Sequence, residues 1–215
     1  NHYTASKYAV SFMGVLFDWI SQPSTACGLL LVAMPGVGDV GKLAIDAVNT
    51  ELDAEPIARI LHPALPPLAK LDDDGLLSPP HILLSRIQID GKEVFTLTGD
   101  AQPMTPEGQH EIAMAVLDLF EGGEVLVLAG MSAQAERKDI FTITSSSNYR
   151  IDLESMGVDV RRDEPKSGVI GMAALITALG PVKDVRTSCT IATTVGNSAD
   201  PVAAQLLLET IRKWW

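Results

Sequence analysis

The chain contains very little cysteine, and this scarcity excludes several classes of protein. Its 215 residues include two cysteines, Cys27 and Cys189. Two cysteines are too few for a disulfide-stapled secreted scaffold, and their spacing matches no zinc-binding pattern. We therefore expect two reduced and buried thiols, which favours a cytoplasmic protein.

Basic side chains are also scarce. The sequence has 16 lysine and arginine residues against 27 aspartate and glutamate residues, which gives a formal net charge of −11 at pH 7. A nucleic-acid duplex would be repelled by this charge, because binding to DNA or RNA relies on cationic side chains that release counterions. The composition therefore predicts that the chain has no nucleic-acid partner.

The chain also lacks a long apolar run of the kind that spans a membrane. The apolar stretch from Tyr8 to Ile20 contains Asp18 and is shorter than the ~20 residues that a membrane span requires. Because no basic run precedes it and no convincing cleavage site follows it, we predict neither a signal peptide nor a membrane partner. We expect an amphipathic helix here and assign residues 1–27 to an N-terminal helical extension.

Histidine is rare and falls in no catalytic or metal-binding pattern. The four histidines include no pair with the spacing of metal ligands. Ser132 follows a predicted strand, where an α/β-hydrolase has its nucleophile, but Gln134 replaces the second glycine of the G-x-S-x-G motif. No histidine follows the last predicted strand to act as its base. We therefore predict no catalytic residue and no metal site.

Apolar side chains, by contrast, make up 47% of the chain, which is enough to bury the core of one domain. Apolar runs bounded by glycine or proline alternate with segments of helical periodicity. This alternation predicts an α/β fold with a mainly parallel, mixed sheet covered by helices on both faces, and we assign residues 28–215 to a single domain of this kind. The expected strands span residues 28–34, 56–63, 81–90, 93–99, 124–130, 140–145 and 188–195, and the expected helices span residues 41–52, 105–120, 168–180 and 200–214.

Residues 63–80 interrupt this alternation. They are rich in proline and acidic side chains and include the run Asp72-Asp73-Asp74. The three aspartates lack the alternating spacing of a calcium-binding loop, which indicates a solvated turn. We expect an ordered excursion or a flexible arm.

A glycine-rich loop follows the first buried strand, at "AMPGVGDVGK". Gly36, Gly38 and Gly41 satisfy the G-x-G-x-x-G pattern of dinucleotide-binding loops and open a helix. The acidic residue that should end the second strand is missing, since Glu55 lies at its start. The related G-x-x-x-x-G-K-[ST] pattern has Leu43 in place of its hydroxyl residue. The loop is therefore interpreted first as a tight structural turn, with an anion or small-molecule contact as the alternative and a nucleotide loop as the least favoured reading.

A second polar loop follows the predicted hairpin, at residues 98–109. Asp100, Gln102 and Glu107 lie at the carboxyl end of a strand and just before a helix. Open parallel sheets usually bind their ligands at this edge, so these residues are candidates for a ligand or interface site. The alternative is that Asp100 and Gln102 satisfy backbone N–H groups within the turn.

Three stretches together resemble the proteasome assembly chaperone family, in its archaeal and bacterial branch. They are "MPGVGDVGKLAIDAVNTEL", "HPALPPLAKLDDDGLL" and "TLTGDAQPMTPEGQHEIAMAVLDL", and the resemblance extends roughly from Gly28 to Trp214. It implies a three-layer α/β/α sandwich similar to purine nucleoside phosphorylases. It also implies a homo-oligomer that needs no cofactor and, in some members, binds proteasome α-subunits.

The carboxyl terminus departs from that family. Some members end in a hydrophobic residue, a tyrosine and one further residue, a tail that docks on the proteasome, whereas this chain ends Lys213-Trp214-Trp215. Trp214 and Trp215 are candidates for anchoring a partner, since tryptophan is enriched at interface hot spots. The alternative is that both residues pack the last helix onto the core.

Two hypotheses for the function follow. The first is a non-enzymatic, homo-oligomeric assembly chaperone or scaffold that binds partner protein subunits. The second is a nucleoside-phosphorylase-like enzyme or small-molecule binder with its site between the loops 36–41 and 100–107, which are expected at one edge of the sheet. No arginine lies near either loop to hold a phosphate.

Overall fold

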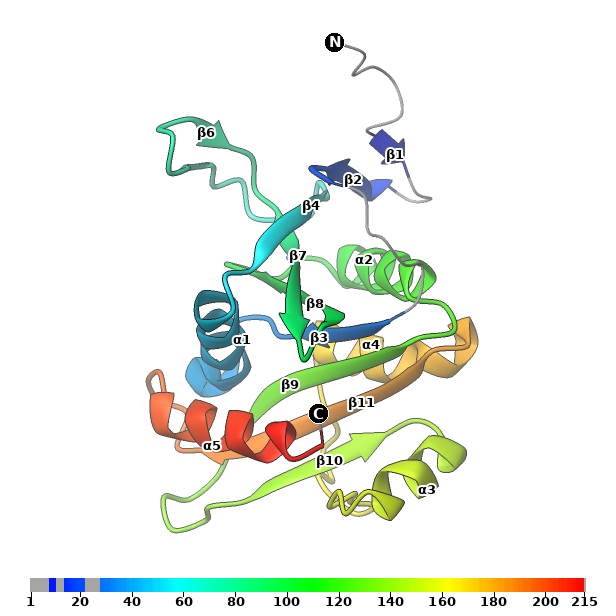
Figure 1. Cartoon of the computed structure of the whole chain (residues 1–215). Helices are drawn as coiled ribbons and strands as arrows, with labels where there is room; N and C mark the ends of the chain where they lie inside the picture. Colours follow the sequence, from blue (N-terminus) through cyan, green and yellow to red (C-terminus); the bar gives the residue numbers. More distant parts are fainter. Residues whose placement is uncertain (1–7, 11–13, 22–27, 215) are drawn as a thin grey trace.

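A computed structural model describes residues 8–10, 14–21 and 28–214. Nine strands of these ranges form one central sheet in the order β1-β2-β4-β7-β8-β3-β9-β11-β10, shown in Figure 1. They are β1 (Tyr8–Val10), β2 (Leu16–Trp19), β3 (Leu29–Val32), β4 (Glu55–Leu61), β7 (Ile82–Ile89), β8 (Lys92–Gly99), β9 (Glu124–Ser132), β10 (Ile140–Thr144) and β11 (Arg186–Thr194). The helices are α1 (Val40–Glu51), α2 (Pro106–Leu119), α3 (Ser147–Ser155), α4 (Met172–Leu179) and α5 (Pro201–Arg212).

The centre of the sheet is parallel and its two sides are antiparallel. Strands β8, β3, β9 and β11 run parallel to one another, with Val32 opposite both Leu97 and Val127. The remaining pairs of the sheet are antiparallel. Among them, β7 and β8 form the predicted hairpin, in which Asp90 and Gly91 both have positive φ, as a tight two-residue turn requires.

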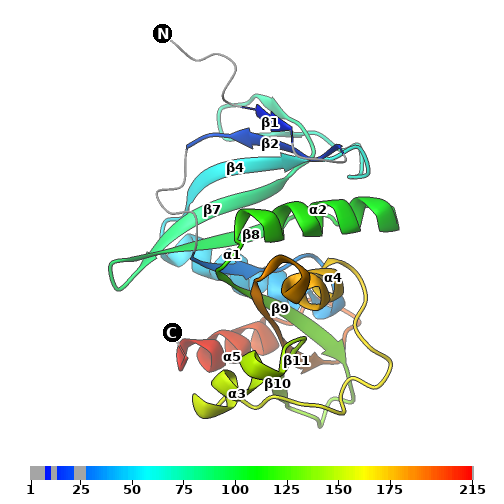
Figure 2. The same ribbon diagram turned by 90° about the vertical axis from the view of Figure 1, so that its right-hand side faces the viewer.

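Helices cover both faces of the sheet, which makes three layers (Figure 2). Side chains of α1 and α5, including Ile45 and Leu207, form one buried cluster with the sheet. Side chains of α2 and α4, including Ile112 and Ile176, form another on the opposite face. The predicted α/β class and the α/β/α sandwich are therefore confirmed. No helix in the described part of the chain is long and apolar enough to cross a membrane.

The local signals for two helix starts are also confirmed. The Thr105 hydroxyl accepts a hydrogen bond from the Gly108 N–H at the start of α2. The Asp200 carboxylate accepts one from the Ala203 N–H at the start of α5. Such side-chain caps satisfy N–H groups that have no partner within the helix. The helix expected from residue 168 begins only at Met172, because Gly168 and Gly171 both have positive φ and form a loop.

The predicted N-terminal helix is wrong for the residues that the structure describes. Residues 8–10 and 16–19 form β1 and β2, and β2 pairs with β4, so the sheet continues across the expected boundary at residue 27. Val15 and Phe17 are buried. The next residue, Asp18, points to the other face of the strand and pairs with Arg59 on β4. This two-residue alternation is the strand period, and the aromatic and β-branched side chains favour a sheet. The rest of the predicted extension lies outside the described residues.

The two cysteines have different outcomes. Cys189 on β11 is a free and buried thiol, and burial raises its pKa to about 12. Desolvation disfavours the thiolate, so this thiol is unreactive in the folded chain. Cys27 lies outside the described residues.

Candidate functional site

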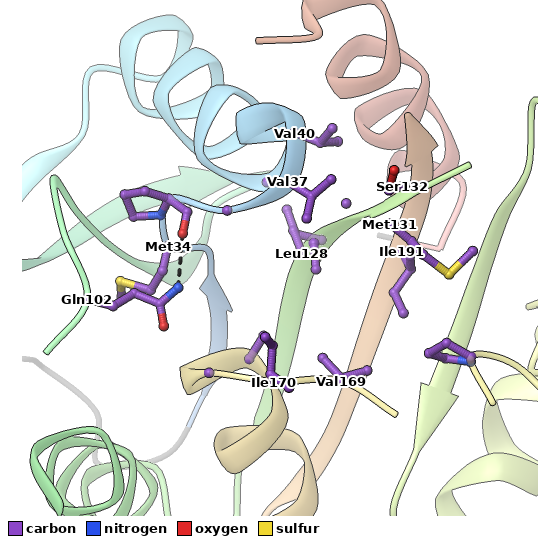
Figure 3. Close-up of a pocket in the computed structure, with 18 of the residues that line it drawn as sticks. Met34, Val37, Val40, Gln102, Leu128, Met131, Ser132, Val169, Ile170 and Ile191 are labelled. Carbon is purple, nitrogen blue, oxygen red and sulfur yellow. Dashed lines mark hydrogen bonds between the residues drawn. The ribbon is translucent and has the colours of Figure 1, made fainter. Parts of the chain in front are cut away.

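The carboxyl ends of three parallel strands open into a cleft of about 820 Å³. Strands β3, β9 and β11 lie side by side in register, so the segments that follow them meet at one edge. A loop from the far side of the sheet, residues 165–171, forms the opposite wall. We call this feature the strand-end cleft. Its larger side chains are those of Met34, Val37, Val40, Leu128, Met131, Val169, Ile170 and Ile191, shown in Figure 3.

The cleft carries no charge of its own. Among the described residues, its lining contains no charged side chain and no histidine, and its polar side chains are Gln102, Gln109, Ser132 and Ser167. Ile170 is 91% exposed at its mouth. A cleft of this composition can bind apolar groups and donate a few hydrogen bonds. The described part of its lining offers no cationic side chain for a phosphate and no histidine or carboxylate as a base.

The glycine-rich loop forms one side of the cleft, and packing against the sheet explains its tightest positions. A Cβ atom at Gly41 would lie 2.2 Å from the carbonyl oxygen of Leu128, and one at Gly38 would lie 2.8 Å from the Thr194 hydroxyl. Gly38 also has φ of +64°, a conformation that glycine adopts readily. Gly36 and Gly41 line the cleft, so the loop both brings α1 close to β9 and shapes the site.

Gln102 is the polar residue that joins the two sides of the cleft. Its Nε2 donates to the carbonyl of Pro35 at 2.9 Å, and its Oε1 accepts from the Met172 N–H at 3.1 Å. One side chain therefore connects the loop after β3 with the first residue of α4. In Figure 3 it lies beside Met34 at the edge of the cleft. Replacing it would remove both of these hydrogen bonds between the loop after β3 and the start of α4.

The other two candidates of this loop do not line the cleft. Asp100 forms an ion pair with Lys70 at 3.0 Å, and the hydrogen bond from that lysine lowers the pKa of the carboxyl group below its ordinary value. Glu107 lies exposed in the first turn of α2, where a negative charge is favourable to the helix dipole. The structure thus brings Gly36, Gly41 and Gln102 together and leaves Asp100 and Glu107 outside.

An ionic network lies next to the 165–171 wall of the cleft, and the sequence analysis did not predict it. The guanidinium of Arg161 bonds to Asp139, Asp159 and Glu164 and lies 4.8 Å from the Phe141 ring centroid. Hydrogen bonds to Asp159 and then to Asp139 raise the pKa of Arg161, and the Arg137 guanidinium lowers the pKa of Asp139. The network fixes the residues just before the 165–171 loop. Its only sequence signal is the alternating charge of residues 159–166.

Ser132 lies in the cleft without the partners of a nucleophile. Its hydroxyl donates to the carbonyl oxygen of Val195 at 3.2 Å. The ring of His62 faces Glu111, and that of His81 faces the carbonyl of Pro79. In the described ranges, no group of three histidine, cysteine, aspartate or glutamate residues could hold a metal ion. Ser132 is the last residue of β9, and its hydroxyl is bonded to the backbone just after the neighbouring strand β11.

The two terminal tryptophans differ in what the structure shows. Trp214 is half-buried and packs against the clusters of α1 and α5 and of α3, which include Ile211 and Leu153. Trp215 lies outside the described residues. Trp214 therefore attaches the end of α5 to the core, and its proposed role as a partner anchor stays a prediction.

Comparison with known proteins places these features in a family. The model of the PAC2 family matches residues 30–214. An uncharacterised protein of Methanocaldococcus jannaschii is 25% identical over 186 residues, which are 84% of this chain and 71% of that protein.

Solved structures share the fold. PbaB of Pyrococcus furiosus, described as an archaeal proteasome activator, is 19% identical with a TM-score of 0.78 over 93% of this chain and 88% of its own. PbaA of the same organism, described as an archaeal homologue of proteasome-assembly chaperone, is 22% identical with a TM-score of 0.75 over 92% and 81%. A proteasome-assembly chaperone homologue of Mycobacterium tuberculosis is 19% identical with a TM-score of 0.64 over 86% and 84%. At these identities the likeness concerns the fold.

Proposed function

The chain belongs to the PAC2 family, and from this premise we propose that it is a non-enzymatic assembly chaperone or scaffold that binds protein subunits. The strand-end cleft receives apolar side chains of the partner. As the sequence resemblance implies, the chain acts as a homo-oligomer and its partners are proteasome α-subunits.

One observation carries this proposal. The cleft has a volume of about 820 Å³ and, within the described residues, no charged side chain in its lining. A site for a phosphorylated substrate needs a cation or a cluster of N–H donors, as phosphate recognition elsewhere shows. A protein segment needs only apolar surface and a few hydrogen-bonding groups, because burial of aromatic and aliphatic anchors supplies most of the free energy of binding.

The mouth of the cleft supports a protein partner. Ile170 is 91% exposed, and Val37 on the opposite side of the cleft is 41% exposed. Burial of one such side chain contributes about 1.5–3 kcal/mol. Ile170, Val37 and matching anchors of a partner would therefore supply several kcal/mol toward the roughly 8 kcal/mol of a micromolar complex. Exposed apolar surface around a hollow is typical of a protein interaction site.

A second candidate is an uncharged small molecule. The volume of the cleft falls within the range of small-molecule sites, and it lies where parallel sheets usually bind ligands. This reading keeps the predicted site between the loops 36–41 and 100–107, with Gln102 as a hydrogen-bonding group. A phosphorylase activity has less support, because neither loop places an arginine or histidine in the lining.

The test is native mass spectrometry of the purified chain with proteasome α-subunits from the same organism. We expect a complex with the wild-type chain and at least a tenfold weaker one with Ile170→Asp. The matched control is Ile151→Asp, since Ile151 is 61% exposed on α3 and does not line the cleft. Equal binding by all three chains would contradict the role of the cleft. Absence of any complex, with a bound small molecule instead, would favour the second candidate.

A further inference from the structure

The segment between β4 and β7 forms an arm outside the central sheet. Its strands β5 (Lys70–Leu71) and β6 (Leu77–Ser78) pair only with each other, as a two-stranded sheet. In Figure 1 the arm projects from the body beside β4. We call residues 64–80 the β5–β6 arm. An isolated hairpin this short is marginal in water, so contacts elsewhere must hold it in place.

The arm has its polar side toward the body and its apolar side toward solvent. In the hairpin register, Lys70 lies opposite Ser78 and Leu71 lies opposite Leu77, so the two pairs occupy opposite faces. Lys70 pairs with Asp100, and the Ser78 hydroxyl accepts from Arg59 Nη1 at 3.1 Å. Leu71 and Leu77 are 71% and 68% exposed.

This orientation is unusual, because water normally favours polar side chains on the exposed side and apolar side chains on the side of the protein body. Two more leucines of the arm, Leu68 and Leu76, are equally open to solvent. Single exposed leucines are ordinary on a protein surface, but four on one short projection are not, and Leu71 and Leu77 lie opposite each other on its solvent side, which indicates an interaction site. The ion pair and hydrogen bond on the other face hold this pair in a fixed orientation.

The same chain offers a hollow that matches this projection. The strand-end cleft is open, and its described lining is mainly apolar and carries no charge. The pair Leu71 and Leu77 on the solvent side of the arm is also apolar and uncharged. The net charge of −11 makes two copies of this chain repel each other over most of their surface. Contact between the uncharged leucine pair of the arm and the uncharged lining of the strand-end cleft brings no like charges together.

Anionic side chains form the tip of the arm, and one cation, Lys166, stands beside the cleft. Asp72, Asp73 and Asp74 form the tip of the arm, and Asp72 accepts hydrogen bonds from the Asp74 and Leu76 N–H groups. Lys166 lies between two residues of the cleft wall and is exposed. Within the described ranges, none of the three aspartates and no atom of Lys166 takes part in an ion pair. An arm seated in the cleft can bring these charges together.

We propose that the β5–β6 arm of one copy docks its leucine face into the strand-end cleft of a second copy. The contact joins two different surfaces, so it can be reciprocal in a dimer or propagate around a ring. The inference rests on the proposed function only in using the same cleft as a binding surface. Arm docking and partner binding then compete for that cleft.

The test is a complementation experiment by sedimentation velocity on the full chain, without any partner. The arm variant carries Leu71→Ser and Leu77→Ser, and the cleft variant carries Ile170→Asp. We expect the wild-type chain to associate and each variant alone to associate at least tenfold more weakly. A mixture of the two variants should regain a two-chain species, because one retains an intact cleft and the other an intact arm.

Controls separate loss of the contact from loss of the fold. Leu71, Leu77 and Ile170 are exposed, so both variants should keep the wild-type melting temperature at a concentration where all chains are monomeric. Ile151→Asp should associate like wild type. Lys166→Glu should weaken association, and Asp73→Lys in the same chain should restore it.

Four outcomes would overturn the inference. They are a wild-type chain that is monomeric at 100 µM, an arm variant that associates like wild type, a cleft variant that does so, and a mixture that yields no two-chain species. The last would indicate contact of arm with arm or cleft with cleft. Binding to proteasome α-subunits is absent from this experiment, so its result is independent of the test of the proposed function.

Discussion

Substitution of Gly41 by alanine tests why the glycine-rich loop has its sequence. In a helix interior, alanine is favoured over glycine by about 1 kcal/mol. Here, however, the new Cβ atom would lie 2.2 Å from the Leu128 carbonyl oxygen and 3.0 Å from the Ala33 Cβ. The first neighbour is backbone of β9, and the second is the one-carbon side chain of the buried Ala33, so neither can rotate away. Overpacking of this kind typically costs about 1–3 kcal/mol and sometimes more.

The steric term should exceed the gain in helix propensity. We expect Gly41→Ala to lower the free energy of unfolding by about 1–2 kcal/mol. For a chain of this length, that corresponds to a melting temperature roughly 2–8 °C lower. Urea denaturation and thermal melting of the same preparation measure the two quantities independently.

Gly36 supplies a matched control in the same loop. Its φ is −166°, which is ordinary extended backbone, and the nearest atom to a Cβ there is 3.9 Å away. Gly36→Ala should therefore leave stability within about 1 kcal/mol of wild type. If Gly41→Ala proved as stable as Gly36→Ala, the packing explanation would be refuted. The glycines would then need a ligand that approaches the backbone.

Three further predictions follow from contacts of the same region. Asp200→Ala should lower the free energy of unfolding by about 1 kcal/mol through loss of the α5 cap, measured by urea denaturation, and Asp200→Asn should retain most of it. The hydrogen bond from the Ala203 N–H, and then that from the Thr194 hydroxyl, lower the folded pKa of Asp200. Arg137 lowers the folded pKa of Asp139. The stability that these two carboxylates contribute is therefore present above their unfolded pKa of about 3.9 and is lost as pH falls through the lower folded pKa. Unfolding measured from pH 7 to pH 2 should show a decline below about pH 4 that is smaller in Asp200→Asn, and an equal decline would contradict the assignment. Arg161→Ala should lower the free energy of unfolding by about 1–3 kcal/mol and increase amide hydrogen exchange of residues 163–171. Unchanged exchange there would show that the ionic network does not hold the cleft wall.

Local signals in the sequence predicted the interior of the fold well. Thr105 and Asp200 precede proline and begin helices, and Asp90-Gly91 joins two alternating runs. Each of these residues acts on backbone groups within a few positions of itself. Two of the four parallel strands, β3 and β9, contain apolar runs, and burial on both faces accounts for that composition.

The N-terminal strands were missed because their pattern is short. Val15, Phe17 and Trp19 alternate over only a few residues, and Leu16 within that run is also apolar, so a helical period fits nearly as well. The deciding interactions are with a strand more than forty residues away, where Arg59 meets Asp18. No local pattern contains that partner.

The site was predicted in part for the same reason. Gly36 and Gly41 follow a recognisable strand and open a helix, so their place at the edge of the sheet could be expected. The wall opposite them depends on Gln102, whose contact with the Met172 N–H joins residues seventy positions apart. The sequence marked Gln102 as polar and well placed, but it could not identify the helix that Gln102 holds.

The arm shows most clearly what a pattern cannot decide. Alternation within "KL" and "LS" assigns Leu71 and Leu77 to one face and Lys70 and Ser78 to the other, and the usual rule would turn the leucines toward the core. Here the opposite orientation occurs, because Asp100 and Arg59 on the body of the protein bind Lys70 and Ser78 of the hairpin. The leucines then face solvent in an isolated chain. In the proposed contact, the uncharged cleft of a second copy buries Leu71 and Leu77. The orientation of Lys70, Leu71, Leu77 and Ser78 in the hairpin therefore supports the proposed assembly of two copies.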